Sequence, residues 1–185
     1  MACSKKQTGK FRDCKLRIND PALNIVNTKI KKYFEGRCLD LGCGTGRHLL
    51  LMPRNNTGLD VDDKSFSSIK KRGESFNLIM HDLNEFPYPL GKSQFDTVLC
   101  SHVIEHLYSP YLTLMEIKRI LKPDGILIIA VPNPQCIFSD VYAKGWIKGL
   151  HINVWDSYSI QKLLAIHDFN ILARYCNHPF SSQFA

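Results

Sequence analysis

A short apolar segment that runs into a turn with three glycines constrains the fold of this chain more than any other feature. Residues 38–46 read Cys-Leu-Asp-Leu-Gly-Cys-Gly-Thr-Gly. The glycines at positions 42, 44 and 46 permit a positive φ and let backbone N–H groups approach a ligand closely. Such a turn after a strand is typical of nucleotide-binding loops. The segment therefore predicts a ligand site directly after a buried strand.

The carboxylate of Asp40, two residues before the first glycine, indicates the charge of that ligand. Dinucleotide sites use the spacing G-x-G-x-x-G and rest a pyrophosphate on a helix N-terminus. Here the spacing is G-x-G-x-G, and a carboxylate beside a pyrophosphate would repel it. The same carboxylate attracts a sulfonium or an ammonium group. The motif favours a nucleoside that carries positive charge and no phosphate, and S-adenosylmethionine is such a molecule.

Strand and helix patterns alternate along the chain. This alternation predicts an α/β fold, a three-layer Rossmann-like sandwich with a mostly parallel sheet and helices on both faces. In such a sheet the ligand lies at the carboxyl ends of the strands. The predicted strands cover 37–41, 56–60, 76–80, 95–100, 125–131 and 169–176, and the predicted helices cover 22–33, 45–52, 64–72, 109–121 and 157–167.

The positive charge of the chain is concentrated near its start. Of the net charge of +7, residues 1–37 supply all, with ten Lys and Arg against three Asp and Glu. We expect a basic N-terminal arm over residues 1–20 and a single domain over residues 21–185. The arm is either a solvated tail or a flap that attracts an acidic substrate. Nucleic acid is a weakly supported partner, because only Phe11 offers stacking within the first 32 residues.

Cysteine usage and hydropathy bear on location. The seven cysteines are scattered, and no C-x-x-C pair occurs, which fits a reducing compartment better than a disulfide framework or a cysteine zinc site. No apolar run approaches the roughly 20 residues of a membrane helix. The sequence therefore predicts a cytoplasmic protein with no membrane partner.

Five segments, in order, resemble motifs of the class I S-adenosylmethionine-dependent methyltransferases, and in particular the ubiquinone-pathway O-methyltransferases. The resemblance implies a methyltransferase domain over residues 21–185 with S-adenosylmethionine as its cofactor. It also implies methyl transfer to an oxygen, or with less support a nitrogen, of a small-molecule or glycan acceptor. The family closes its sheet with an antiparallel strand, which we expect to be short or missing here. The segments are 39–46, 57–62, 80–83, 95–107 and 119–129.

The resemblance also implies which residues bind the cofactor. Asp60 would accept the ribose hydroxyls, and Asp82 would accept the adenine amino group while the Leu83 N–H reaches a ring nitrogen. The alternative for both aspartates is a structural role at a turn or helix N-terminus. The full predicted set is Asp40, Gly42, Cys43, Gly44, Asp60, Val61, Asp82, Leu83 and Ser101.

A cluster of titratable residues follows the fourth predicted strand. Residues 102–106 match H-x-x-E-H, a zinc-peptidase signature, but their place after a strand of a nucleoside-binding sheet argues against a peptidase. In the ubiquinone-pathway enzymes and in those that methylate the 3′ end of small RNAs, Glu-x-x-Glu-His and a later histidine hold a divalent ion. Glu105, His106 and His151 match that set, and His102 replaces the first glutamate.

Because imidazole replaces a hard ligand there, we predict that no metal is used and that Glu105, His106 and His151 do not converge. His102 and His151 are then candidate general bases, since an unperturbed imidazole has a pKa of about 6.5. The alternatives are that His102 packs against the cofactor and that His151 lies in a surface loop.

Residues 132–156 are rich in aromatic side chains and predict either a cover over the substrate or a helix packed on the core. Two functional alternatives to metal-free transfer remain open, a metal-assisted O-methyltransferase and a catalytically silent binding subunit with the same fold. Asp40 and the compressed glycine spacing disfavour a nucleotide-dependent oxidoreductase.

Overall fold

The computed structural model describes residues 27–53, 56–132 and 151–175. The predicted arm over 1–20 and residues 133–150 of the aromatic segment lie outside the described residues. So do residues 177–185, where the closing antiparallel strand was expected.

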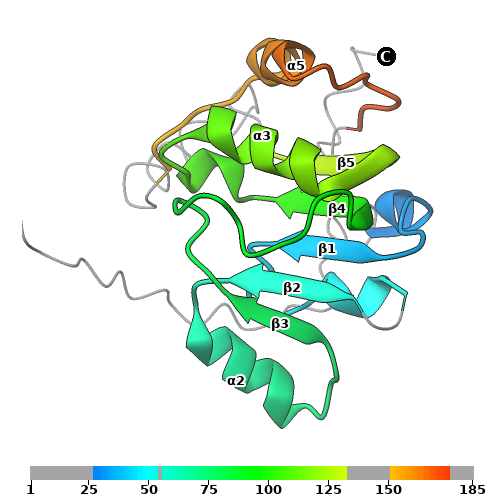
Figure 1. Cartoon of the computed structure of the whole chain (residues 1–185), viewed down its shortest axis with the longest axis vertical. Coiled ribbons are helices and arrows are strands. Elements are labelled where there is room, and N and C mark those ends of the chain that lie inside the picture. The colour runs from blue at the N-terminus through cyan, green and yellow to red at the C-terminus, as the bar shows by residue number, and fades with distance from the viewer. Residues whose placement is uncertain (1–26, 54–55, 133–150, 176–185) are drawn as a thin grey trace, which may run out of the picture.

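Five strands form a single sheet in the order β3-β2-β1-β4-β5, and every pairing between them is parallel. This confirms the predicted α/β class, because the central strand is the first in sequence and the chain crosses over from one side of it to the other. Figure 1 shows the five strands side by side, with β3 at one edge and β5 at the other. The strands are β1 (Cys38–Leu41), β2 (Thr57–Asp60), β3 (Asn77–Met80), β4 (Phe95–Ser101) and β5 (Leu121–Ala130).

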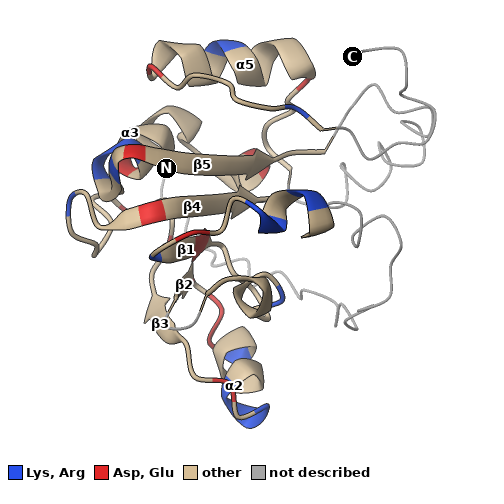
Figure 2. Ribbon diagram, turned by 90° about the vertical axis from the view of Figure 1, so that its right-hand side faces the viewer, with Lys and Arg blue, Asp and Glu red and all other residues tan. Residues whose placement is uncertain are grey.

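The helices begin where capping residues satisfy the first free N–H groups. The Asp62 side chain accepts a hydrogen bond from the backbone N–H of Lys64, 3.1 Å away. At the other end of this helix, Lys70 and Lys71 lie in the last turn, where positive charge is favourable. Figure 2 colours the Lys and Arg positions of the chain blue, including those of this helix. The helical elements are α2 (Asp63–Lys71), α3 (Pro110–Ile120), α5 (Ser157–Ile166) and the short 3₁₀ turns η1 (Leu49–Leu51) and η2 (Ile104–His106).

Two apolar clusters, one on each face of the sheet, account for the three layers. Alternate residues of β1 enter different clusters: Leu39 and Leu41 pack with α3 and α5, whereas Cys38 packs with η1, α2 and the helical turn at residues 27–31. Asp40 lies two residues after Cys38 in the strand. Since side chains alternate between the two faces of a sheet, its carboxylate lies on the same face as Cys38. The prediction of helices on both faces is confirmed.

Three predicted elements differ from the structure. The strand expected over 125–131 is β5, which begins four residues earlier, at Leu121. The helix expected over 45–52 is reduced to η1, because Gly46 adopts a φ of +77° and ends any regular helix there. The strand expected over 169–176 does not form within its described part, where residues 169–175 pair with no other strand. The side chain of Leu172 is 76% exposed. This segment therefore does not bury its apolar residues as a strand of the sheet would.

The carboxyl ends of the strands meet at one edge of the sheet. Asp60 lies at the end of β2 and Ser101 at the end of β4, on either side of the turn that follows β1. This edge therefore collects the residues that the sequence singled out. Within the described residues, no helix combines the length and the apolar character needed to cross a bilayer.

Candidate active site

The glycine turn after β1 is held by the neighbouring strand. The N–H groups of Gly42 and Cys43 both donate to the Leu59 carbonyl, at 2.8 and 3.2 Å. Gly42 and Gly44 both have positive φ, at +67° and +48°. A Cβ atom on Gly42 would overlap Val103, whereas one on Gly44 would meet no described atom within 4 Å. Gly42 is thus required by internal packing, whereas no described atom fills the space beside Gly44.

Asp60 organises this turn in the structure. One of its carboxylate oxygens accepts the N–H of Gly44 at 2.8 Å, and the other accepts the N–H of Asp62 at 2.9 Å. The helix-capping role that the sequence left open for this region belongs to Asp62. A carboxylate has about four acceptor positions, so Asp60 retains capacity for ribose hydroxyls, and that role stays a prediction.

Asp40 is the most deeply buried carboxylate at this edge, with 1% of its surface exposed. Its Oδ2 accepts no hydrogen bond from the described residues, and Nδ1 of His48 lies 3.8 Å from it. Burial raises the pKa of Asp40 to about 8, with a further contribution from Asp60 and an opposing one from Arg47. An unpartnered buried carboxyl oxygen is the acceptor that a cationic ligand requires.

His48 lies beside that oxygen but does not form an ion pair with it. Burial lowers the pKa of His48 to about 4, and Arg47 and His102 lower it further. At neutral pH the imidazole is therefore uncharged and Asp40 holds its proton, so the 3.8 Å contact joins two neutral groups. The spacing of residues 40 and 48 contains no signal for this contact, which depends on how η1 packs on β1.

Asp82 and Leu83 follow β3 at the same edge. The Asp82 carboxylate accepts hydrogen bonds from the backbone and side-chain amides of Asn84, at 2.9 and 3.1 Å. This is the turn-stabilising role that the sequence left open for Asp82. The Leu83 carbonyl accepts the Tyr88 hydroxyl at 3.1 Å. Contacts of Asp82 and Leu83 with adenine stay predictions.

Val61 and Ser101 complete the predicted cofactor set. Val61 directly follows Asp60 and is largely exposed, and Ser101 is the half-buried last residue of β4. The cofactor contacts of both stay predictions.

The chain turns sharply at His102, directly after β4. Its φ is +55°, in the left-handed region that non-glycine residues rarely adopt, and its N–H donates to the Ala130 carbonyl at 2.9 Å. The imidazole is about half exposed, with Nδ1 at 3.5 Å from Oε1 of Glu105. Strained residues of this kind collect at functional sites, which agrees with the role predicted for His102.

Glu105, His106 and His151 converge, and the prediction that they do not is wrong. Their potential ligand atoms lie within 4.8 Å of one another. The cause is a pair of backbone hydrogen bonds, in which Ile152 and Asn153 both donate to the Glu105 carbonyl at 3.0 Å. These bonds fold the segment that carries His151 back over the end of β4.

Glu105 is buried, with 2% of its surface exposed, and neither of its carboxylate oxygens has a hydrogen-bond partner among the described residues. The rings of His106 and His151 meet edge to face, with centroids 4.5 Å apart. Burial, followed by the proximity of His106, lowers the pKa of His151. The cluster thus offers a neutral imidazole and a buried carboxylate at one point.

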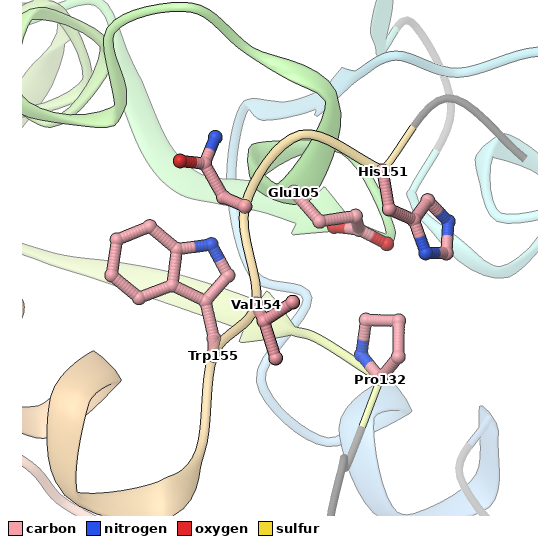
Figure 3. Close-up of a pocket in the computed structure, with 6 residues that line it drawn as sticks. Glu105, Pro132, His151, Val154 and Trp155 are labelled. Atoms are coloured by element: carbon pink, nitrogen blue, oxygen red, sulfur yellow. The ribbon is translucent and has the colours of Figure 1, made fainter. Parts of the chain in front are cut away.

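A small pocket opens beside this cluster (Figure 3). Glu105 and His151 lie close together at one side of it, and the indole of Trp155 lies at the other, with Pro132 and Val154 between them. The indole nitrogen is buried and has no hydrogen-bond partner among the described residues. The pocket combines apolar walls with a polar end.

Known proteins resemble the chain in both sequence and fold. Residues 39–129 match the family described as "Methyltransferase domain". The ubiquinone biosynthesis O-methyltransferase of Haemophilus ducreyi is 28% identical over 135 residues, which cover 68% of this chain and 57% of that protein. The enzyme of the same name from Maricaulis maris is 30% identical over 161 residues, which cover 79% of this chain and 63% of that protein.

A solved structure shares the fold. The S-adenosylmethionine-dependent methyltransferase of Archaeoglobus fulgidus superimposes with a TM-score of 0.65 at 24% identity, covering 80% of this chain and 69% of that one. The chain spans less than two thirds of both O-methyltransferases above. The parallel sheet, the glycine turn with its buried carboxylate and these similarities agree with one another. Residues 39–129 therefore carry the methyltransferase domain of the class I S-adenosylmethionine-dependent methyltransferases, a family whose cofactor is S-adenosylmethionine.

Proposed function

We propose that the chain transfers the methyl group of S-adenosylmethionine to an oxygen atom of a small molecule. The observation that carries this proposal is the adjacency of two half-sites at one edge of the sheet. The glycine turn packs directly against Val103 at the position of Gly42, and Val103 immediately precedes η2, which carries Glu105 and His106. A methyl donor in the turn and an acceptor beside η2 would therefore be neighbours.

The chemistry is an in-line displacement. The acceptor oxygen forms a bond to the methyl carbon, the carbon–sulfur bond breaks, and sulfur keeps the electron pair. The sulfonium supplies the reactivity, and the protein aligns the two reactants and excludes water. The proton of the hydroxyl group goes to His151, whose lowered pKa leaves it neutral and able to accept at pH 7. His102 is the second candidate base, on the more exposed side of Glu105.

Two observations support oxygen as the acceptor atom. The relatives described above are O-methyltransferases by name, and a hydroxyl group benefits from the base that the cluster provides. The apolar side chains of Pro132, Val154 and Trp155 beside Glu105 support a partly apolar acceptor.

Metal-assisted transfer is a second candidate, favoured by the convergence of Glu105, His106 and His151. The donor set fits a divalent ion, since one carboxylate and two imidazoles suit zinc and related metals, and the Glu105 oxygens are buried without hydrogen-bond partners among the described residues. These three side chains would hold the ion. Its chemistry would be to lower the pKa of the acceptor hydroxyl.

The test is a methylation screen with isotope-labelled S-adenosylmethionine against separate pools of metabolites, glycans and RNA. We expect label in small phenolic or alcoholic metabolites, as base-stable ethers. Label on nitrogen would overturn the choice of acceptor atom. Binding of the cofactor without transfer to any pool would instead favour a catalytically silent subunit.

A further inference from the structure

Asp40 and His48 form a buried contact that the alignment of the methyl donor with its acceptor does not require. Asp40 lies inside β1, and His48 starts η1 on the same face of the sheet, where its carbonyl accepts the N–H of Leu51 at 2.9 Å. The two side chains are almost wholly buried, and the 3.8 Å between Nδ1 and Oδ2 is too long for a hydrogen bond. His48 therefore occupies the place of a counter-ion without providing one.

The charged and titratable groups around this pair do not compensate Asp40. Among the described residues, Arg47 is the one cation that acts on it, and its effect is smaller than that of burial, while Asp60 acts in the opposite direction. Asp40 thus holds its proton while the site contains no cation. The other groups coupled to the pair are Cys43 in the glycine turn, Cys100 in β4 and His102 after it.

We propose that Asp40 and His48 make the site select the cationic methyl donor over its neutral product. When the donor enters, its sulfonium stabilises the Asp40 carboxylate, the O–H bond of the carboxyl group breaks, and the proton passes to the solvent. The net charge of the site is unchanged, since one positive charge enters and one leaves. After transfer the sulfur is a neutral thioether, Asp40 takes up a proton again, and the product is held less tightly.

His48 acts in this scheme as a positioning residue. Its uncharged ring covers the Oδ2 side of Asp40, keeps water away from that oxygen and adds no positive charge. A site with water or a permanent cation at this position would keep Asp40 ionised. Neither the donor nor the product would then release a proton from Asp40 on binding. The inference rests on the proposed function in one respect, namely that the methyl donor occupies the glycine turn that follows Asp40.

The experiment is titration calorimetry at pH 7 in two buffers of different ionisation enthalpy, with S-adenosylmethionine and S-adenosylhomocysteine as ligands. The Asp40→Asn variant gives the baseline, because it retains any titration of the ligands' own amino groups. Above that baseline we expect release of about one proton with the donor and none with the product. Donor affinity relative to product affinity should rise about tenfold per pH unit below pH 7 and level off above pH 8.

Variants of His48 test its part separately. His48→Phe keeps a dry, neutral neighbour and should retain the proton release, whereas His48→Ala admits water and should reduce it by more than half. Equal proton release for both ligands in the native protein would overturn this inference and leave the proposed function standing. Absence of binding by both ligands would overturn the two together.

Discussion

At the scale of the residue, we expect Gly44 to leave room for the cofactor. Gly44→Val should abolish the binding of S-adenosylhomocysteine, because the side chain would project into space that no described atom occupies and that the cofactor needs. Gly73→Val is the matched control, since Gly73 also has a positive φ, +71°, and open space around its Cβ position. Both variants carry the same type of backbone strain. Calorimetry that finds unchanged affinity in Gly44→Val would contradict the cofactor assignment.

The opposite pKa shifts of Asp40 and His48 predict an unusual stability profile. The folded pKa of Asp40 is raised to about 8, so its stabilising contribution is lost as the pH rises through 8. The folded pKa of His48 is lowered to about 4, so its contribution is lost as the pH falls from about 6.5 towards 4. The two effects oppose each other below pH 6.5, and only Asp40 acts between 6.5 and 8.

We therefore expect the free energy of unfolding of the ligand-free protein to fall between pH 6.5 and 8, by up to about 1.4 kcal/mol per pH unit. Denaturant titrations at several pH values would measure this slope, and Asp40→Asn should remove it. A native slope of zero or of opposite sign in this range would show that Asp40 is ionised in the free protein.

At the scale of elements, the site depends on how η2 and the segment 151–153 meet. His102 turns the chain at the end of β4, and the Glu105 carbonyl then receives two N–H groups from the returning segment. A backbone contact of this kind holds His151 in place whatever its side chain does. The His151 side chain can thus be removed while the segment stays attached.

This attachment allows metal-free and metal-assisted transfer to be separated. In metal-free transfer, His151→Ala should lower kcat by roughly 10²-fold, the size of a general-base contribution, and a chelator should leave the native rate intact. His81→Ala is the control, because His81 contacts the Glu85 carbonyl outside the cluster and should keep its kcat. A native rate that collapses with chelator and returns with added zinc or manganese would favour the metal-assisted alternative.

At the scale of the whole molecule, the charge distribution predicts a role for the N-terminal arm. If residues 1–20 attract an anionic acceptor, their deletion should raise the KM for that acceptor and flatten its dependence on salt. Steady-state kinetics at low and high ionic strength, with the native and shortened chains side by side, would measure both effects. Identical kinetics in the two chains at every salt concentration would identify the arm as a solvated tail.

The sequence by itself predicted the five strands of the sheet, although β5 begins four residues before its predicted start and the sixth predicted strand does not form within residues 169–175. β1, β2 and β3 begin and end within one residue of their predicted bounds, and β4 extends one residue further. These features are local, because a run of apolar residues next to a glycine turn by itself predicts a buried strand at that place in the chain. The five ordered motifs added the family and its cofactor.

Only the tertiary structure decided which distant side chains meet. Residues 169–175 have the composition of a strand but no partner strand among the described residues. Residues 45–48 form no helix, because the glycine turn includes Gly46. His151 lies beside Glu105, and His48 lies beside Asp40. In each pair the two residues come from different segments, and the sequence pattern of neither segment predicts the contact. Such contacts depend on how two elements pack together and on which backbone groups remain free to pair. The spacing of residues along the chain predicts neither the packing nor the free backbone groups.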